Sequence, residues 1–203
     1  MTQTHKTNPA PSAAEAAVRR VLKSAPQELW LDTIRRTQGA AHDGLVFWMI
    51  NQTQCDFAVA VHAFYRSDPG QYLDLPRPLP AQPGPDDIFA QVLMNWDTGY
   101  YRTHDLAVSN QDVEPRQLVR LNQKVMARPQ ASLPYSIPKR FLDPKGGMSF
   151  TLAPTLSPDD AKHLWPLYAK LGLQVPPAAP GIRRKLAVAK DWLNIVKLPK
   201  QGI

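Results

Sequence analysis

The chain has few of the residues that give small folds covalent or metal-based stability. It contains one cysteine, Cys55, among 203 residues, so it can form no internal disulfide, and it has no cysteine-rich zinc spacing. No stretch approaches the roughly 18 consecutive apolar residues that span a bilayer. Residues 1–20 also have no apolar segment behind a basic start, as an export signal would. We therefore expect a cytoplasmic, soluble protein that does not associate with membranes and is stabilised by packing.

Glycine is scarce as well, and the ten glycines form no phosphate-binding loop. The pair Gly146-Gly147 lacks the spacing and the lysine-hydroxyl pair that such a loop requires. Hydrophobic residues make up 43% of the chain, which is enough to bury a real core. A disordered chain is excluded by this composition.

Positive charge is present but unevenly placed. The net charge is +7, and residues 111–203 hold 15 lysines and arginines against 6 acidic residues. Such a bias attracts nucleic acid, an acidic protein or anionic lipid, or it only keeps a surface solvated, and charge alone does not choose among these.

Helical periodicity runs through most of the sequence. Ser12 and Glu15 have the spacing of a capping box at a helix start. The six apolar residues LVFWMI suit a buried strand or a buried helix, and their helical neighbours favour a short helix. We expect an all-α protein of packed helical pairs, with helices near 13–24, 27–38, 45–52, 56–67, 86–97, 113–127, 158–171 and 181–197. In the seventh of these, Pro166 should cause a kink and Gly172 should end the helix.

Proline divides the chain. Six of the 21 prolines fall between Pro69 and Pro85, which predicts an extended loop, and residues 128–157 contain five more. The predicted organisation has four parts: a flexible tail at 1–12, a helical domain at 13–127, an irregular linker or wrap at 128–157, and a basic helical segment at 158–203 that packs on the core.

Cys55 and Asp56 precede an apolar run with helical spacing. Asp56 is placed to cap that helix with its carboxylate. A nucleophilic Cys55 would need a lowered thiol pKa and a nearby histidine, and the adjacent acid opposes thiolate formation. We interpret Asp56 as a helix cap and Cys55 as a small buried hydrophobe.

Two stretches share an order of parts that indicates a degenerate helical repeat. In the first, a helix leads to a predicted acid-glycine turn at Asp43-Gly44, then to a short apolar helix, and then to Cys55-Asp56 before the next helix. In the second, Trp96 leads to Asp97-Thr98-Gly99 and then to Gln111-Asp112 before a helix. Coincidence explains so loose a match equally well.

The same residues carry a family resemblance. Asp43-Gly44 through CDFAVAVHAFYRSDP, together with NWDTGYY, resembles the bacterial family called domain of unknown function 4274, over residues 28–126. The resemblance implies a small helical module without an established activity, and it transfers no catalytic residue. The structural motif that it implies consists of Asp43, Gly44, Cys55, Asp56, Trp96, Asp97 and Gly99.

His42-Asp43 and His104-Asp105 form two histidine-aspartate doublets. In a helical chain these resemble metal-dependent phosphohydrolases of the HD type, which would use His42, His104, Asp105 and Asp112 to hold a metal and activate water. Asp43 and Asp105, the acids of the two doublets, also stand where turns and helix caps favour an acid. We therefore predict no catalytic residue, no metal and no cofactor, with this hydrolase as an unlikely alternative.

The terminal stripe from Ile182 to Val196 predicts a helix whose charged side faces outward. As a partner-binding hypothesis we take the basic residues of that side and the tail: Arg183, Arg184, Lys185, Lys190, Lys197 and Lys200. The leading prediction is a non-enzymatic helical module that binds a protein partner, in the manner of an immunity protein or an assembly factor. The alternative is nucleic-acid binding, since aromatic residues such as Tyr135 and Trp192 alternate with the basic ones.

Overall fold

Every regular element in the computed structural model is a helix, over the residues that it describes, 10–128, 132–145 and 164–175. The all-α prediction is therefore confirmed for these residues. The helices are α1 (Ala13–Leu22), α2 (Gln27–Arg36), α3 (Asp43–Ile50), α4 (Phe57–Arg66), α5 (Pro69–Asp74), α6 (Ile88–Asp97), α7 (Pro115–Met126), α8 (Lys139–Leu142) and α10 (Trp165–Leu171), with 3₁₀ turns η1 (Ala40–His42) and η2 (Pro85–Asp87). None of them is long and apolar enough to cross a bilayer.

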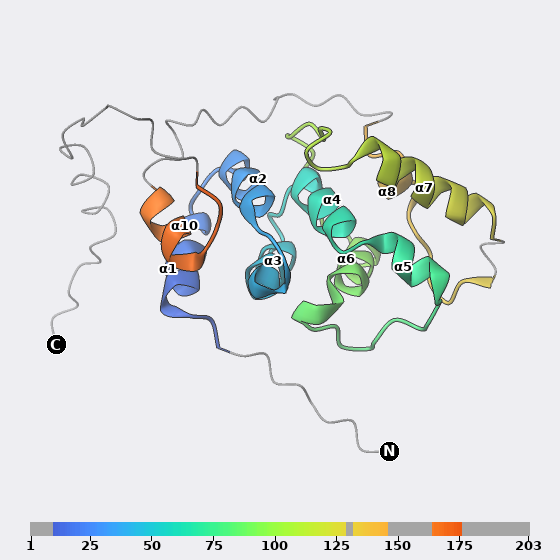
Figure 1. Ribbon diagram of the computed structural model, residues 1–203, viewed down its shortest axis with the longest axis horizontal. Helices are drawn as coiled ribbons and strands as arrows, with labels where there is room; N and C mark the ends of the chain where they lie inside the picture. The colour runs from blue at the N-terminus through green and yellow to red at the C-terminus, as the bar shows by residue number, and fades with distance from the viewer. Residues whose placement is uncertain (1–9, 129–131, 146–163, 176–203) are drawn as a thin grey trace, which may run out of the picture.

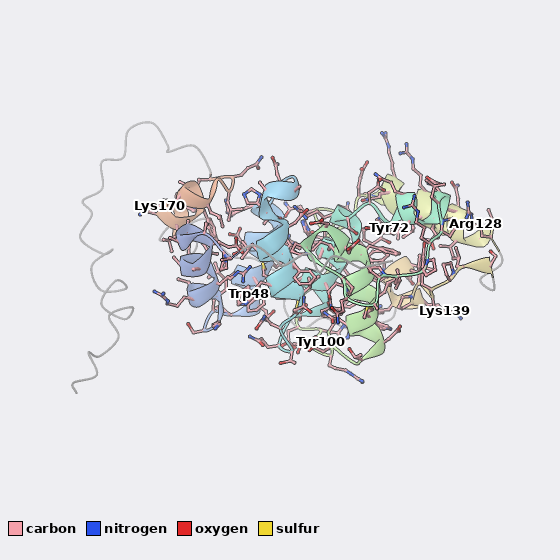
Figure 2. All side chains as sticks on the ribbon, turned by 90° about the horizontal axis from the view of Figure 1, so that it is seen from below. Trp48, Tyr72, Tyr100, Arg128, Lys139 and Lys170 are labelled. Carbon is pink, nitrogen blue, oxygen red and sulfur yellow. The ribbon has the colours of Figure 1, made fainter. Side chains whose placement is uncertain are left out.

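The helices form an elongated array, with α1 and α10 at one end and α7 and α8 at the other (Figure 1). In a second view, Lys170 marks the first end, and Arg128 and Lys139 mark the second (Figure 2). The predicted helix at 181–197, and residues 158–163 of the one before it, lie outside the described residues.

The core centres on α4, which packs against α2 and α6. Every residue of α4 except His62 and Arg66 is buried. Phe64 of this helix stacks near Phe141 of α8, with 4.8 Å between ring centroids, and near Phe89 of α6 at 5.5 Å. These aromatic contacts join segments far apart in the sequence, and they bind the single turn of α8 to the core.

The end formed by α1 and α10 is attached through polar contacts as well as packing. Ser12 caps α1 as predicted, because its Oγ accepts the Glu15 amide at 3.1 Å. Arg19 donates to the Gly44 carbonyl at 2.9 Å and lies over the Trp48 ring, so α1 is joined to α3.

The position of Pro166 corrects one prediction. Pro166 lies in the first turn of α10, where a helix needs no amide donor, so it begins this helix instead of kinking it. Gly172 ends α10 with φ +75°, as predicted. Nε2 of His42 donates to the Leu171 carbonyl at 3.1 Å, and Tyr168 shares a hydrogen bond with Thr33 at 2.7 Å.

The segment 69–85 is only partly an extended loop. Pro69 occupies the first turn of α5, and no further proline follows until Pro76, so a short helix fits between them. The density of prolines along the whole segment obscured this uneven spacing.

The acid-glycine turn predicted at Asp43-Gly44 is wrong. Both residues belong to the start of α3, and the chain turns earlier, at Gly39, where φ is +60°. The second acid-glycine site does end a helix, since Gly99 has φ +86° after α6. However, residues 100–112 contain no helix, so the short helix of the first unit has no counterpart in the second. The order of parts that indicated a repeat is therefore not reproduced.

Candidate interaction surface

The α6–α7 loop, residues 98–114, contacts Asp56 and contains His104, Asp105 and Asp112, four of the residues singled out from the sequence. Tyr101 is buried in this loop with φ +61°, a left-handed conformation that costs a non-glycine residue free energy. Its hydroxyl donates to the Ile50 carbonyl at 3.0 Å and accepts from Asn95 Nδ2 at 3.0 Å. These contacts hold the loop on the ends of α3 and α6.

Asp56 caps α4 as predicted and also holds this loop. Its carboxylate accepts the Ala58 amide at 2.8 Å and the Asp105 amide at 2.8 Å, while its own amide donates to Gln27 Oε1 at 2.9 Å. Burial raises the pKa of Asp56 to about 6, although the amide hydrogen bonds act to lower it. Asp56 thus joins α2, α4 and the loop.

Cys55 is fully buried, as expected for a small packed side chain. Burial raises the pKa of its thiol well above the ordinary value, and the neighbouring Asp56 raises it further. The thiol donates to the Asp56 carbonyl at 3.6 Å. The thiolate form that a nucleophile requires is therefore strongly disfavoured.

Asp112 is the centre of a second buried polar cluster. Arg35 of α2 donates to both of its carboxylate oxygens at 2.7 Å, and His62 of α4 approaches Oδ1 at 3.3 Å. Ser109 donates from its amide and its hydroxyl at 2.8 and 2.9 Å. Burial acts to raise the pKa of Asp112, but the hydrogen bonds from Arg35 and His62 and the charge of Arg35 outweigh it and hold this pKa well below its ordinary value.

Three of the four residues of the hydrolase alternative, His42, His104 and Asp112, make other contacts. His42 bonds the Leu171 carbonyl, and its Nδ1 lies within 3.1 Å of the Gln38 amide. Asp112 is enclosed by Arg35, His62 and Ser109. Burial lowers the pKa of His104, whose ring packs at a tilt against Phe57 with 4.7 Å between centroids. In the described part of the chain, no three His, Cys, Asp or Glu residues gather in a way that could hold a metal ion.

The remaining motif residues of the family resemblance are placed structurally. Asp43 pairs with Arg66 of α4 at 2.7 Å. Trp96 packs against Phe141, with 5.3 Å between ring centroids, and Asp97 is the exposed last residue of α6. These contacts attach helix ends to the core.

The six basic residues of the partner-binding hypothesis, from Arg183 to Lys200, lie outside the described residues. The described residues contain 16 lysines and arginines and 14 acidic residues, so they carry little of the net charge. Because their net charge is small, it does not indicate a binding surface. A surface among the described residues must be recognised from how exposed apolar and charged side chains are grouped.

Sequence periodicity oriented α7 incorrectly. Apolar spacing in the sequence predicts that one face of this helix is formed by Leu118, Val119, Asn122, Val125 and Met126. Instead Leu121 and Val125 are buried and Leu118 is half-buried, while Val119 is 54% exposed and Met126 is 86% exposed. Leu121 is the missed signal, because at about 100° per residue it falls beside Leu118 and Val125 and turns Val119 and Met126 outward.

The exposed side of α7, here called the outer face, consists of Arg116, Val119, Arg120, Gln123 and Met126. It is the structure's strongest candidate for a binding surface, since it combines exposed apolar side chains with cations. The guanidinium groups of Arg116 and Arg120 have no hydrogen-bond or ion-pair partner among residues 10–128, 132–145 and 164–175. A shallow, open hollow next to them is lined by Pro115, Arg116, Val119 and Arg120.

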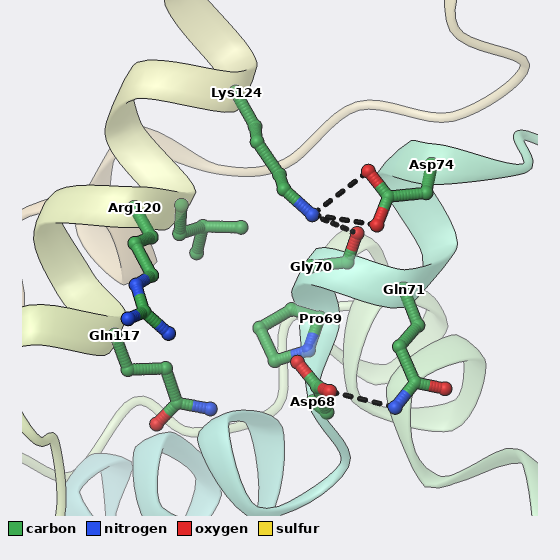
Figure 3. Close-up of a pocket in the computed structure, with 9 residues that line it drawn as sticks. Asp68, Pro69, Gly70, Gln71, Asp74, Gln117, Arg120 and Lys124 are labelled. Carbon is green, nitrogen blue, oxygen red and sulfur yellow. Dashed lines mark hydrogen bonds and ion pairs between the residues drawn. The ribbon is translucent and has the colours of Figure 1, made fainter.

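A second hollow, of about 200 Å³, lies between α5 and α7 (Figure 3). Lys124 crosses it to Asp74, with Nζ 2.6 Å from Oδ2, and also donates to the Gly70 carbonyl at 3.2 Å. Gln71 donates to Asp68 at 2.6 Å. The other polar groups of this hollow are largely satisfied, but Arg120, which also lines it, has no side-chain partner in the described chain.

Comparison with known proteins found no matching family model, no matching curated protein and no matching solved structure. The resemblance to domain of unknown function 4274 stays a prediction.

Proposed function

We propose that this chain is a non-enzymatic helical module that binds another protein through the outer face of α7. The observation that carries the proposal is the exposure of Val119 and Met126 on one helix. Exposed apolar side chains that are grouped on one face and bordered by polar ones mark interaction sites in folded proteins. An immunity protein or an assembly factor would use such a surface.

The non-enzymatic part of the proposal rests on what the candidate chemical groups do. The Cys55 thiol has a raised pKa and no solvent access. The Asp112 carboxylate already accepts hydrogen bonds from Arg35, His62 and Ser109. His42 bonds the Leu171 carbonyl at the end of α10. Each group has a structural role that accounts for its presence.

A photo-crosslinking experiment in the cell of origin tests the proposal. p-Benzoylphenylalanine is placed at position 119, with matched probes at the exposed Arg20 on α1 and at Arg184 of the basic region. We expect position 119 to yield one reproducible protein adduct that position 20 does not yield.

Three results would contradict the proposal. A probe at position 119 that yields no protein adduct removes the outer face from consideration. Adducts only from position 184 would move the interface to the basic region. Adducts with nucleic acid from positions 119 and 184 would support the nucleic-acid alternative instead.

A further inference from the structure

The spacing of the apolar residues on the outer face suits one kind of partner. Val119 and Met126 are seven residues apart, which is two helical turns, or about 10 Å along the axis. An amphipathic helix presents its own apolar side chains at the same spacing, at positions i, i+3 or i+4, and i+7. A helix laid along α7 can therefore cover both exposed side chains at once.

The charge of the outer face restricts the partner further. Arg116 and Arg120 are one turn apart, both are exposed, and within the described chain neither guanidinium has a hydrogen-bond or ion-pair partner. Lys124, one turn further on, is already engaged by Asp74 and Gly70. A guanidinium offers a planar fork that pairs best with a carboxylate, so two carboxylates one turn apart complement these two arginines.

A second copy of this chain is a poorer occupant of the surface. The outer face contains two arginines and no acidic residue, so a self-complementary contact would bring four guanidinium groups together without a carboxylate. Nucleic acid would satisfy the arginines but would leave Val119 and Met126 against a charged backbone.

From this combination we infer that the outer face of α7 binds an acidic amphipathic helix. The apolar residues of that helix cover Val119 and Met126, and its carboxylates pair with Arg116 and Arg120. The inference rests on the proposed function and names the chemistry of the partner.

The probe is a fluorescein-labelled peptide of about 18 residues, with leucine at positions i, i+3 and i+7 and glutamate at most others. There are two control peptides. One has the same composition in scrambled order, and the other has lysine in place of glutamate. Binding to the full chain is followed by fluorescence anisotropy at two salt concentrations. We expect the acidic striped peptide to bind at least about tenfold more tightly than either control, and more weakly at higher salt.

Matched variants of the full chain locate the contact. The double variant Arg116→Glu/Arg120→Glu should lower the affinity for the acidic peptide at least about tenfold and allow the lysine peptide to bind. The double variant Val119→Ser/Met126→Ser should lower the affinity for the acidic peptide by a similar factor. It should change the salt dependence of that affinity less than the arginine variant does. Arg20→Glu with Arg77→Glu makes the same charge change at exposed positions off the outer face, and should leave binding unchanged. Circular dichroism melts confirm that each variant folds.

The inference is overturned if the scrambled peptide binds as well as the striped one, or if the control charge variant weakens binding as much as the α7 variant. A dimer seen by sedimentation and lost in the Val119→Ser/Met126→Ser variant would assign the face to a second copy. Tighter binding of an 18-mer oligonucleotide, lost in the Arg116→Glu/Arg120→Glu variant, would assign it to nucleic acid. If position 119 crosslinks to a protein in cells but no acidic peptide binds, the proposed function stands and the acidic helix alone is rejected.

Discussion

Asp56 and Asp112 are both buried against the α6–α7 loop, and burial acts to raise the pKa of each carboxyl, yet the two pKa values shift in opposite directions because the partners differ. Asp56 has backbone amides as its donors and no cationic partner, so desolvation dominates and its pKa rises to about 6. Asp112 meets the paired nitrogens of Arg35 and the ring of His62, so its pKa falls well below the ordinary value of 3.8. We therefore expect position 56 to tolerate a neutral side chain and position 112 to require a charge.

The difference shows how an irregular segment can be held without a helix of its own. The α6–α7 loop is joined to α4 by the cap residue Asp56 and to α2 by the ion pair of Asp112. The first contact depends on hydrogen-bond geometry, and the second depends on charge as well. Substitutions that remove only the charge should therefore separate the two sites.

The largest effect is expected at Asp112. Asp112→Ala leaves Arg35, whose side chain is 18% exposed, without its counter-ion and the Ser109 amide without its acceptor. We expect a loss of about 3 kcal/mol in the free energy of unfolding, measured by urea denaturation followed by tryptophan fluorescence. Asp112→Asn, which removes the charge and keeps the shape, should lose most of the same amount. A loss below about 1 kcal/mol in the alanine variant would show that this pair does not anchor the loop.

Asp56 should give a smaller loss and a different ranking of variants. Asp56→Ala removes the cap of α4 and the acceptor of the Asp105 amide, which should cost about 1–2 kcal/mol in the same assay. Asp56→Asn keeps one capping oxygen and removes a charge that is disfavoured there, so its loss should be less than half as large. Equal losses at Asn and Ala would mean that the charge of Asp56 is needed, which would erase the contrast with Asp112.

The pH dependence of stability should also distinguish the sites. Because folding raises the pKa of Asp56, its stabilising contribution is complete below the unfolded value of 3.8 and is lost as pH rises through about 6. From pH 7 to pH 5 this group alone should add about 1 kcal/mol to stability. Asp112 has a lowered pKa, so its contribution is present above 3.8 and is lost as pH falls below that value.

The measurement is the unfolding free energy of the unsubstituted protein minus that of Asp56→Asn, taken from pH 4 to pH 8. This subtraction is needed because burial lowers the pKa of His104, which titrates in the same range and acts in the opposite sense. A difference that does not change with pH would contradict the assignment to Asp56.

The smallest effect is expected at His62. Its Nδ1 lies 3.3 Å from Asp112, which keeps the Arg35 fork and the Ser109 donors when His62 is changed. His62→Gln retains a donor of similar reach, and we expect a loss of no more than about 0.5 kcal/mol. A loss as large as that of Asp112→Ala would make His62, and not Arg35, the main partner of the carboxylate.

The sequence predicted the Asp56 site better than the Asp112 site for a physical reason. A helix cap is a local feature, because the capping oxygen and the amide it accepts are two residues apart at Asp56 and Ala58. Arg35 is 77 residues from Asp112, and no local pattern connects them. From the sequence, Asp112 is therefore only an acid that precedes a helix or a member of the metal-binding alternative.

The helices show the same division between local and long-range information. Capping and periodicity predicted most of the described helices, and the prolines predicted breaks. The density of prolines concealed α5, since a count over 69–85 ignores the gap between Pro69 and Pro76. The orientation of α7 follows from its packing against α5 and α8, and an apolar stripe drawn without Leu121 does not predict it.

The way in which the α6–α7 loop is fastened has a consequence for folding kinetics. Its anchors join residues separated by 49 positions at Asp56 and Asp105, by 51 at Ile50 and Tyr101, and by 77 at Arg35 and Asp112. Contacts across such separations close large loops, so they form after the local turns of the helices they connect. We expect substitutions in these anchors to accelerate unfolding while changing the folding rate little, so that this segment without helices determines how long the folded helices persist.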